Sequence, residues 1–456
     1  MVTFRRPRTN PQHSVLGVWA NGERVGTWSV VDGEHRFQYD ESWPASPAAR
    51  WLSLSLPFTP DNLPHRGEVV RNFFDNLLPD NDSIRRRLRD KFTTGNTDTF
   101  DLLAAIGRDC VGSVQLLPTG MTPESFDRIE FLPLNEAQVE QTINHAVTGG
   151  RVVGQELTDD LRISIAGAQE KTALLWHEDQ WCRPVGATPT THIFKLPLGL
   201  VGNMRADMSD SVENEWLCAQ TLAQLGLPVA DCEMSLFGQR KVLVVERFDR
   251  ALQHPQDRAT WIARLAQEDF CQALGVAGER KYENEGGPGI RAILRQLDNS
   301  RRADQDKLAF VKAQLAFWLM AATDGHAKNF SIFLERGGGY RMTPLYDVLS
   351  VWPIMGTGPN QVHPRRAKLA IAIRSNLGSK NTHYHLHEIR TRHWQLLAQQ
   401  SGVPDAFDHM VAMVLLVPDA LERVAAQLPA GFPQRVFKTI RAGMLAQAEQ
   451  FIAELP

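Results

Sequence analysis

The chain has 456 residues, 43% of them hydrophobic and 22% charged, and its formal net charge is −3. This length predicts two or three lobes around a substantial core. The charge gives no electrostatic basis for free-standing nucleic-acid binding, so contact with DNA would require a local patch or a partner.

The five cysteines are scattered, and no pair has the close spacing of a zinc site. They are therefore expected to be reduced thiols in a cytosolic protein. The first 13 residues are basic but lack the apolar stretch of a signal peptide. No window approaches the ~20 apolar residues that span a bilayer. We therefore expect a cytoplasmic protein that makes no membrane contact.

Residues 1–13 are a predicted tail, and residues 14–120 are a predicted small α/β module. Asn21-Gly22 between two apolar runs predicts a β-hairpin. Residues 51–57, WLSLSLP, alternate apolar and polar side chains as a half-buried strand does. Residues 71–92 favour a helix that breaks at Pro79 and then resumes.

The following segment, residues 121–248, alternates strand-like runs with single helices. Residues 209–228 predict a helix with Ser209 or Ser211 as its cap and a stop at Gly226 to Pro228. Four apolar runs are predicted to contain strands: 162–167, 171–184, 191–197 and 240–248.

Long helices dominate the last segment, residues 249–456. Apolar residues recur at helical spacing in 305–323, 388–401, 405–428 and 433–454. A β-rich half thus precedes a helix-rich half.

The most informative stretch contains the loop Asp324-Gly-His-Ala-Lys-Asn329 at the end of a predicted helix. A strand from Phe330 to Leu334, a triple-glycine turn and a second strand then lead to Asp347. A hairpin brings its ends together, so Asp347 is expected to return close to Asn329. Asp-x₄-Asn followed by a hairpin and another Asp is a layout used for phosphoryl transfer. The alternative is that Asp324 and Asn329 merely cap loops.

In that layout Asp324 accepts the proton of the substrate hydroxyl, while Asn329 and Asp347 hold Mg²⁺. Hard oxygen ligands suit Mg²⁺, which keeps waters and substrate phosphates in its shell. His326 and Lys328 could contact phosphate, although a packed histidine and a solvated lysine fit the sequence equally well.

Lys195 lies in a predicted strand, and a helix with Glu213 and Glu215 follows about twenty residues later. This order is similar to that of the kinase lysine–glutamate ion pair. The two glutamates point to different faces of the helix, and Glu215 is the favoured partner. The alternative is that Lys195 is a surface lysine that lies near an acidic helix without a functional role.

Two further segments fit a nucleotide site. An apolar strand ends at Glu246 and leads to Phe248, between the β-rich half and the helix-rich half. In a two-lobed kinase the hinge at this position presents its backbone N–H and C=O groups to adenine. The alternative is an ordinary strand that leaves the sheet. Gly167 and its small neighbours permit close approach to phosphates, and Lys171 could add charge. This is no Walker A loop, because the second glycine is absent.

Several of these segments resemble the signatures of the HipA family of toxin kinases. They are RISIAGAQEKTALL, PTTHIFKLP, VVERFDR, QEDFCQALG, YENEGGPGI, ATDGHAKNFS and TPLYDV. In the first module, FFDNLLPD and FDLLAAIGRDCVGSVQLLP are similar to its N-terminal subdomain. The resemblance covers the chain from about Val15 and is weaker after about residue 351.

The resemblance implies an α+β, two-lobed protein-kinase-like fold with an N-terminal β-rich subdomain and a helical C-terminal lobe. It implies ATP and Mg²⁺ as cofactors, Asp324 as base, Asn329 and Asp347 at the metal, and Lys195 at the phosphates. Ser164 falls at the family's inhibitory autophosphorylation site. The positions implied to contact nucleotide are Ala166, Gly167, Ala168, Gln169, Glu170, Lys171, Lys195, Glu246, Phe248, His326, Asn329 and Tyr346.

The resemblance also implies partners. The phosphorylated substrate would be a protein serine, in glutamyl-tRNA synthetase or another aminoacyl-tRNA synthetase, with growth arrest as the result. A HipB-type antitoxin would neutralise the toxin, and operator DNA would be bound only through that complex. Two alternatives stay open: a co-repressor scaffold that needs no catalysis, and a kinase of small molecules. A scaffold would need none of Asp324, Asn329, Asp347 and Lys195.

Overall fold

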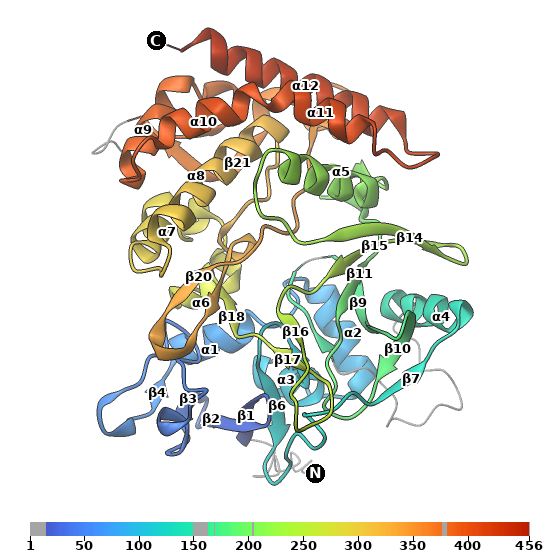
Figure 1. Cartoon of the computed structure of the whole chain (residues 1–456), viewed down its shortest axis with the longest axis vertical. Helices are drawn as coiled ribbons and strands as arrows, with labels where there is room; N and C mark the ends of the chain where they lie inside the picture. The colour runs from blue at the N-terminus through green and yellow to red at the C-terminus, as the bar shows by residue number, and fades with distance from the viewer. Residues whose placement is uncertain (1–14, 149–162, 168, 203–204, 376–380, 456) are drawn as a thin grey trace, which may run out of the picture.

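The computed structural model describes residues 15–148, 163–167, 169–202, 205–375 and 381–455. The predicted tail, residues 1–13, lies outside this part of the chain. The N-terminal sheet and the C-terminal helices α9 to α12 occupy opposite ends of the molecule (Figure 1). No helix in the described ranges is long and apolar enough to cross a membrane.

The first module is built on a five-stranded antiparallel sheet in the order β4-β3-β2-β1-β6. Asn21 and Gly22 adopt positive φ angles of 48° and 85° at the β1–β2 turn, which confirms the predicted hairpin. Trp28 and Phe74 are fully buried and stack at 4.0 Å between ring centroids. The elements are β1 (Val15–Ala20), β2 (Glu23–Val31), β3 (Glu34–Tyr39), β4 (His65–Arg66), α1 (Glu68–Asp75), α2 (Asp82–Phe92), α3 (Thr99–Ile106), β5 (Asp109–Cys110) and β6 (Gln115–Pro118).

The helical break at Pro79 is confirmed, since α1 ends at Asp75 and α2 begins at Asp82. The predicted strand at 51–57 is wrong. This segment forms a turn with a single bridge between Ser53 and Leu56. Its polar groups make tertiary contacts instead of strand pairs, because Ser53 Oγ and the Leu54 amide donate to the buried carboxyl group of Glu268.

A second sheet has the order β14-β15-β11-β9-β10-β7. Its strands alternate their side chains between two faces. Val242 and Val244 pack into the cluster under α4, whereas Leu243 and Val245 pack into the cluster that includes α5. The elements are β7 (Phe131–Pro133), α4 (Glu136–Thr148), β9 (Lys171–His177), β10 (Gln180–Pro184), β11 (His192–Lys195), α5 (Ser211–Gln224), β14 (Cys232–Phe237) and β15 (Arg240–Glu246).

Helix α5 ends before Gly226, whose φ is 74°, as expected. The expected serine cap is wrong. Asp210 occupies the cap position without a side-chain hydrogen bond. Ser209 Oγ donates to Asp207, and Ser211 Oγ accepts from the Leu198 amide, so both hydroxyls are used elsewhere.

The strand before the glycine loop, β8 (Ile163–Ser164), has only two residues and does not pair with β9. It pairs in parallel with β5 of the first module, matching Asp109 with Ile163 and Cys110 with Ser164. The glycine loop therefore starts on the N-terminal module and ends on the second sheet.

The C-terminal half is mainly helical, as expected. The helix predicted at 405–428 is two helices, because Pro418 near the start of the second one has no amide to donate. The remaining elements are β12 (Gly199–Val201), β13 (Ala206–Met208), β16 (Arg250–Gln253), β17 (Trp261–Arg264), β18 (Gln267–Asp269), α6 (Phe270–Ala273), α7 (Ile290–Leu297), α8 (Ala303–Met320), β19 (Ser331–Leu334), β20 (Tyr340–Met342), β21 (Lys368–Arg374), β22 (Thr382–His385), α9 (Thr391–Ser401), α10 (Ala406–Leu415), α11 (Val417–Ala425) and α12 (Gln434–Ala453).

Candidate active site

A cavity of about 190 Å³ lies where the second sheet, the loop after α8 and the first module meet. Its wall includes almost all of the residues that the sequence singled out. These are Ala166, Gly167, Gln169, Lys171, Lys195, Glu246, Phe248, Asp324, His326, Asn329, Tyr346 and Asp347. Ala168 lies outside the described residues.

Lys195 forms two buried ion pairs at this cavity. Its Nζ lies 2.5 Å from Glu215 Oε1 and 2.8 Å from Asp347 Oδ1. Glu213 instead pairs with Lys241, so Glu215 is the partner, as favoured from the sequence. Burial alone would lower the pKa of Lys195, but Asp347 and Glu215 outweigh it and raise the pKa. The lysine is therefore held as a cation inside the protein.

Asp347 has the left-handed φ of 60°, which aspartate tolerates better than most residues. Burial would raise the pKa of its carboxyl, but Lys195 and then Lys171 hold that pKa well below the usual range. The hydroxyl of Tyr346 donates to the Lys328 carbonyl at 2.8 Å. The neighbours of Asp347 and Asn329 are thus in contact, as the predicted hairpin requires.

The loop after α8 presents Asp324 toward the cavity. More than half of this side chain is exposed, at 58%, although surrounding protein atoms still raise the pKa of the carboxyl by withdrawing water. The Tyr282 hydroxyl donates to Asp324 Oδ1, which opposes that rise. Asn329 Nδ2 donates to the Asp324 carbonyl at 2.7 Å and fixes the loop. The base candidate is therefore both accessible and oriented.

His326 is 3% exposed, and burial lowers its pKa to about 3. The imidazole is consequently neutral near pH 7. Its Nδ1 is buried without a hydrogen-bond partner in the described part of the protein, as is Oδ1 of Asn76 in the same cavity wall. Both residues belong to the cavity wall, so two buried polar groups beside the cavity lack partners within the described protein.

The glycine loop bends at Gly167, whose φ is 111°. A Cβ atom there would meet the Lys171 amine at 2.6 Å, so only glycine leaves room for the 2.7 Å hydrogen bond from Lys171 Nζ to the Ala166 carbonyl. Burial lowers the pKa of Lys171 to about 8. Ser164 is fully buried just before the loop, and its Oγ donates to the Leu77 carbonyl at 2.7 Å.

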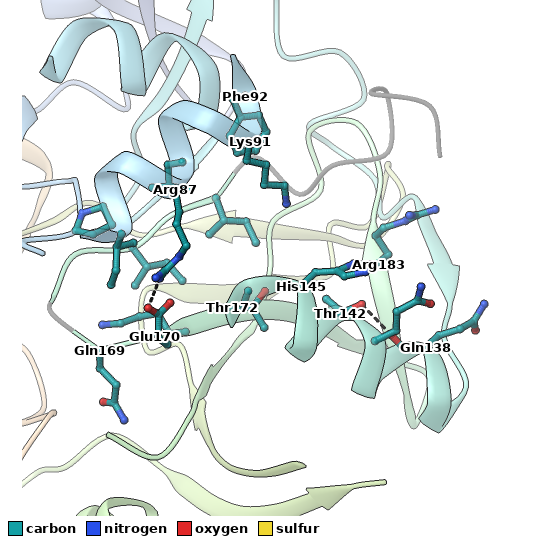
Figure 2. A pocket seen from close by; sticks show the side chains of 18 of the residues that line it. Arg87, Lys91, Phe92, Gln138, Thr142, His145, Gln169, Glu170, Thr172 and Arg183 are labelled. Carbon is teal, nitrogen blue, oxygen red and sulfur yellow. Dashed lines mark hydrogen bonds and ion pairs between the residues drawn. The ribbon is translucent and has the colours of Figure 1, made fainter. Parts of the chain in front are cut away.

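The expected nucleotide contact of Glu170 stays a prediction, and the structure places this side chain apart from the other expected contacts. Glu170 does not line this cavity but a separate hollow of about 260 Å³ on the other side of the loop. There it forms an ion pair with Arg87 of α2, and Figure 2 shows the two side chains directed at each other. Its neighbours Gln169 and Lys171 line both the cavity and this hollow, whereas Glu170 lines only the hollow.

Within the described part of the chain, the hinge includes a backbone donor that makes no hydrogen bond. The amides of Glu246 and Arg247 donate to the carbonyls of Asp231 and Thr191, at 2.8 and 2.9 Å. Among the described contacts, the Phe248 amide is the first after β15 without such a bond. The Phe248 ring lies 5.8 Å from that of Tyr346, so an aromatic wall adjoins a free N–H, which suits a purine.

No group of three or more His, Cys, Asp or Glu side chains in the described ranges is placed to hold a metal by itself. Mg²⁺ does not need such a cage, because it is typically held by one or two carboxylates together with substrate phosphates. The oxygens of Asp347 and Asn329 at the cavity wall fit that mode of binding.

Sequence reasoning missed the contribution of the first module. Asn76, Leu77 and Asp80 line the cavity, and so does Lys281 from the segment before α7. FFDNLLPD, which ends at Asp80, and YENEGGPGI, which follows Lys281, were noted only as family-like segments. Their residue types gave no reason to place Asp80 or Lys281 at the cavity. The tertiary structure brings Asp80 into contact with both Lys281 and Lys328.

The two-lobed α+β fold with this cavity between its lobes belongs to the class of kinase-like proteins. Over residues 16–117 the sequence matches the HipA N-terminal domain, and over residues 163–425 it matches the HipA-like C-terminal domain. The chain therefore belongs to the HipA family of serine/threonine kinase toxins.

Individual relatives agree with this assignment. Y4mE of Sinorhizobium fredii, a protein named as a kinase, is 34% identical over 396 residues, which cover 85% of this chain and 86% of Y4mE. The serine/threonine-protein kinase toxin HipA of Shewanella oneidensis is 29% identical over 321 residues, or 66% of this chain and 68% of that protein. The fold is similar to that of HipA in the solved complex of Shewanella oneidensis HipA, HipB and operator DNA, with a TM-score of 0.75, 23% identity, and coverage of 96% and 97% of the two chains.

Proposed function

We propose that this protein transfers the γ-phosphate of ATP to a protein serine and acts as a toxin. The observation that carries the proposal is the single cavity in which Lys195 contacts both Glu215 and Asp347 while Asp324 stays accessible. Stability alone does not account for a buried lysine between two carboxylates, because desolvation of the charges offsets much of their attraction. A cation at this place can balance phosphate charge.

Each group in the cavity then has a chemical role. Lys195 would bind phosphate oxygens, and the Phe248 amide with the Glu246 carbonyl would bind adenine. Asp347 and Asn329 would hold Mg²⁺, which neutralises charge on the phosphates. Asp324 would accept the proton of the incoming serine hydroxyl, and Tyr282 would hold its carboxylate toward the substrate.

Regulation by Ser164 is part of the proposal. The hydroxyl is fully buried against Leu77, so a phosphate there cannot be accommodated without moving the glycine loop. A phosphate also adds about −1.5 to −2 charges beside the site for ATP phosphates. Autophosphorylation would therefore inactivate the enzyme.

The proposed partners follow the named relatives. The fold neighbour was solved with HipB and operator DNA, which supports a HipB-type antitoxin for this chain. We propose an aminoacyl-tRNA synthetase, with glutamyl-tRNA synthetase as the first candidate, as the substrate, and growth arrest as the consequence. A scaffold that represses without catalysis is less well supported, because it would not need the Lys195 ion pairs.

The test is phosphoryl transfer from labelled ATP with Mg²⁺ to purified aminoacyl-tRNA synthetases, followed by identification of the labelled protein. Asp324→Gln is the matched inactive variant, because loss of a general base typically costs ~10²–10⁴ in rate. Label on a synthetase with wild type but not with Asp324→Gln is expected. Equal labelling by both would show that Asp324 is not the base, and no labelling by wild type would contradict the proposed substrate class.

A further inference from the structure

One wall of the cavity comes from the N-terminal module, and its charged residue is Asp80. Asp80 Oδ1 lies 2.7 Å from Lys328 Nζ, and Oδ2 lies 2.8 Å from Lys281 Nζ. All three side chains line the cavity and are largely buried, with exposures of 16%, 4% and 14%. A single carboxylate of the first module thus joins two lysines that come from separate segments of the C-terminal lobe.

Asp80 and Lys328 in this ionic unit both carry a charge. Burial would raise the pKa of Asp80, but Lys328 and Lys281 outweigh it and hold that pKa low. Burial would lower the pKa of Lys328, but Asp80 outweighs it and raises that pKa. Removing one member of a buried ion pair leaves the other uncompensated, so each lysine depends on Asp80 for its position.

Both lysines are covalently next to catalytic candidates. Lys328 immediately precedes Asn329. Lys281 immediately precedes Tyr282, whose hydroxyl donates to Asp324. The Lys281 carbonyl also accepts from the Ala327 amide at 3.3 Å. A shift of either lysine would therefore displace Asp324, Asn329 or both.

The same part of the first module holds the glycine loop. The Asp80 amide donates to the Gly167 carbonyl at 3.1 Å, and Pro79 forms a bridge with Gly167. Leu77 accepts from Ser164, and Arg87 pairs with Glu170 at the far side of the loop (Figure 2). Residues 77–87 consequently contact the loop at three of its positions, Ser164, Gly167 and Glu170.

We propose that Asp80 is a positioning residue for phosphoryl transfer, through which the N-terminal domain aligns the catalytic loop with the glycine loop. This inference rests on the proposed kinase function. It makes the N-terminal domain a structural part of the active site, because its Asp80 sets the places of Lys281 and Lys328 beside the reacting groups.

The test compares Asp80→Asn with Asp75→Asn. Asp75 is a matched control because it lies in the same module, has the same 16% exposure and pairs with Arg85 at 2.9 Å, but does not line the cavity. Asp80→Asn is expected to lower kcat by ~10²-fold, the typical cost of misplacing a catalytic group by about 1 Å. KM for ATP should change by less than about threefold, since the binding groups Lys195, Asp347 and the hinge are retained. Asp75→Asn should leave kcat within about threefold of wild type, and Asp80→Glu should recover part of the kcat that Asp80→Asn loses.

Hydrogen exchange of residues 163–167 and 324–329 provides a readout that does not depend on turnover. Faster exchange of both loops in Asp80→Asn but not in Asp75→Asn is expected. Equal kcat and equal exchange in the two variants would overturn the inference. If the wild type transfers no phosphate, the proposed function fails, and the exchange comparison still decides whether Asp80 positions the two loops.

Discussion

The amine of Lys195 lies 2.8 Å from the carboxylate of Asp347, although 152 residues separate them in the chain. The contact joins strand β11 of the second sheet to the segment after β20 in the C-terminal lobe. The proposed phosphate site is therefore formed by residues of both lobes, and it depends on how the lobes pack against each other.

This contact predicts that Asp347→Asn abolishes Mg²⁺-dependent binding of ATP. The substitution removes the negative charge that offsets the metal and Lys195 together. Calorimetric titration with Mg-ATP measures the effect, and Asp75→Asn serves as the control for a buried aspartate outside the cavity. Unchanged affinity of Asp347→Asn would remove Asp347 from the proposed metal site.

The buried hydroxyl of Ser164 predicts that modification at this position inactivates the protein. Ser164→Ala should retain turnover, because only the hydrogen bond to Leu77 is lost, at a cost of about 1 kcal/mol in stability. Phosphorylated protein should be inactive and should show fast hydrogen exchange in residues 163–167. Mass spectrometry coupled to activity assays tests this. Stoichiometric phospho-Ser164 on a fully active kinase would contradict it.

Glu268 predicts a pH dependence of stability. This carboxyl is fully buried between Ser53 and Leu54, and burial raises its pKa to about 8. The folded protein therefore retains the proton at pH values where the unfolded chain has lost it. Its contribution to stability is present at low pH and is lost as the pH rises from about 4.5 to about 8, by at most about 1.4 kcal/mol per pH unit.

Glu268→Gln should remove this dependence, because the amide keeps the shape of the protonated carboxyl and can bond to the same partners. Urea unfolding at pH 6 and pH 8.5 measures the difference. The wild type should lose more of its free energy of unfolding than Glu268→Gln does over this interval. The exposed control Glu285→Gln should follow the wild type, and identical pH slopes for all three proteins would show that Glu268 titrates normally.

The net charge of −3 predicts weak binding of operator DNA by this chain alone. Phosphate contacts dominate DNA affinity and depend steeply on salt, so a basic antitoxin dimer should supply most of them. Gel-shift titrations at physiological salt should show tight binding only when antitoxin is present. Tight, sequence-specific binding by this chain alone would contradict the prediction and identify a DNA-binding surface of its own.

Local patterns in the sequence were sufficient where neighbouring residues decide the structure. Asn21-Gly22 specifies a tight turn because both residues accept positive φ, and Pro79 ends a helix because it cannot continue the hydrogen-bond ladder. The spacing from Asp324 to Asn329, followed by a hairpin, was likewise enough to identify residues that line one cavity. Such features depend on residues that are close in the sequence, so they can be predicted from the order of residue types.

The tertiary structure alone decided features that depend on distant partners. Residues 51–57 alternate like a strand, yet they form a turn because Glu268, more than 200 residues away, takes their hydrogen bonds. Strand β8 pairs with β5 instead of β9, which buries Ser164 against the first module. Asp80 reaches Lys328 across 248 residues. A carboxylate pairs with whichever cation the fold brings near, and its own neighbours in the sequence do not specify that cation.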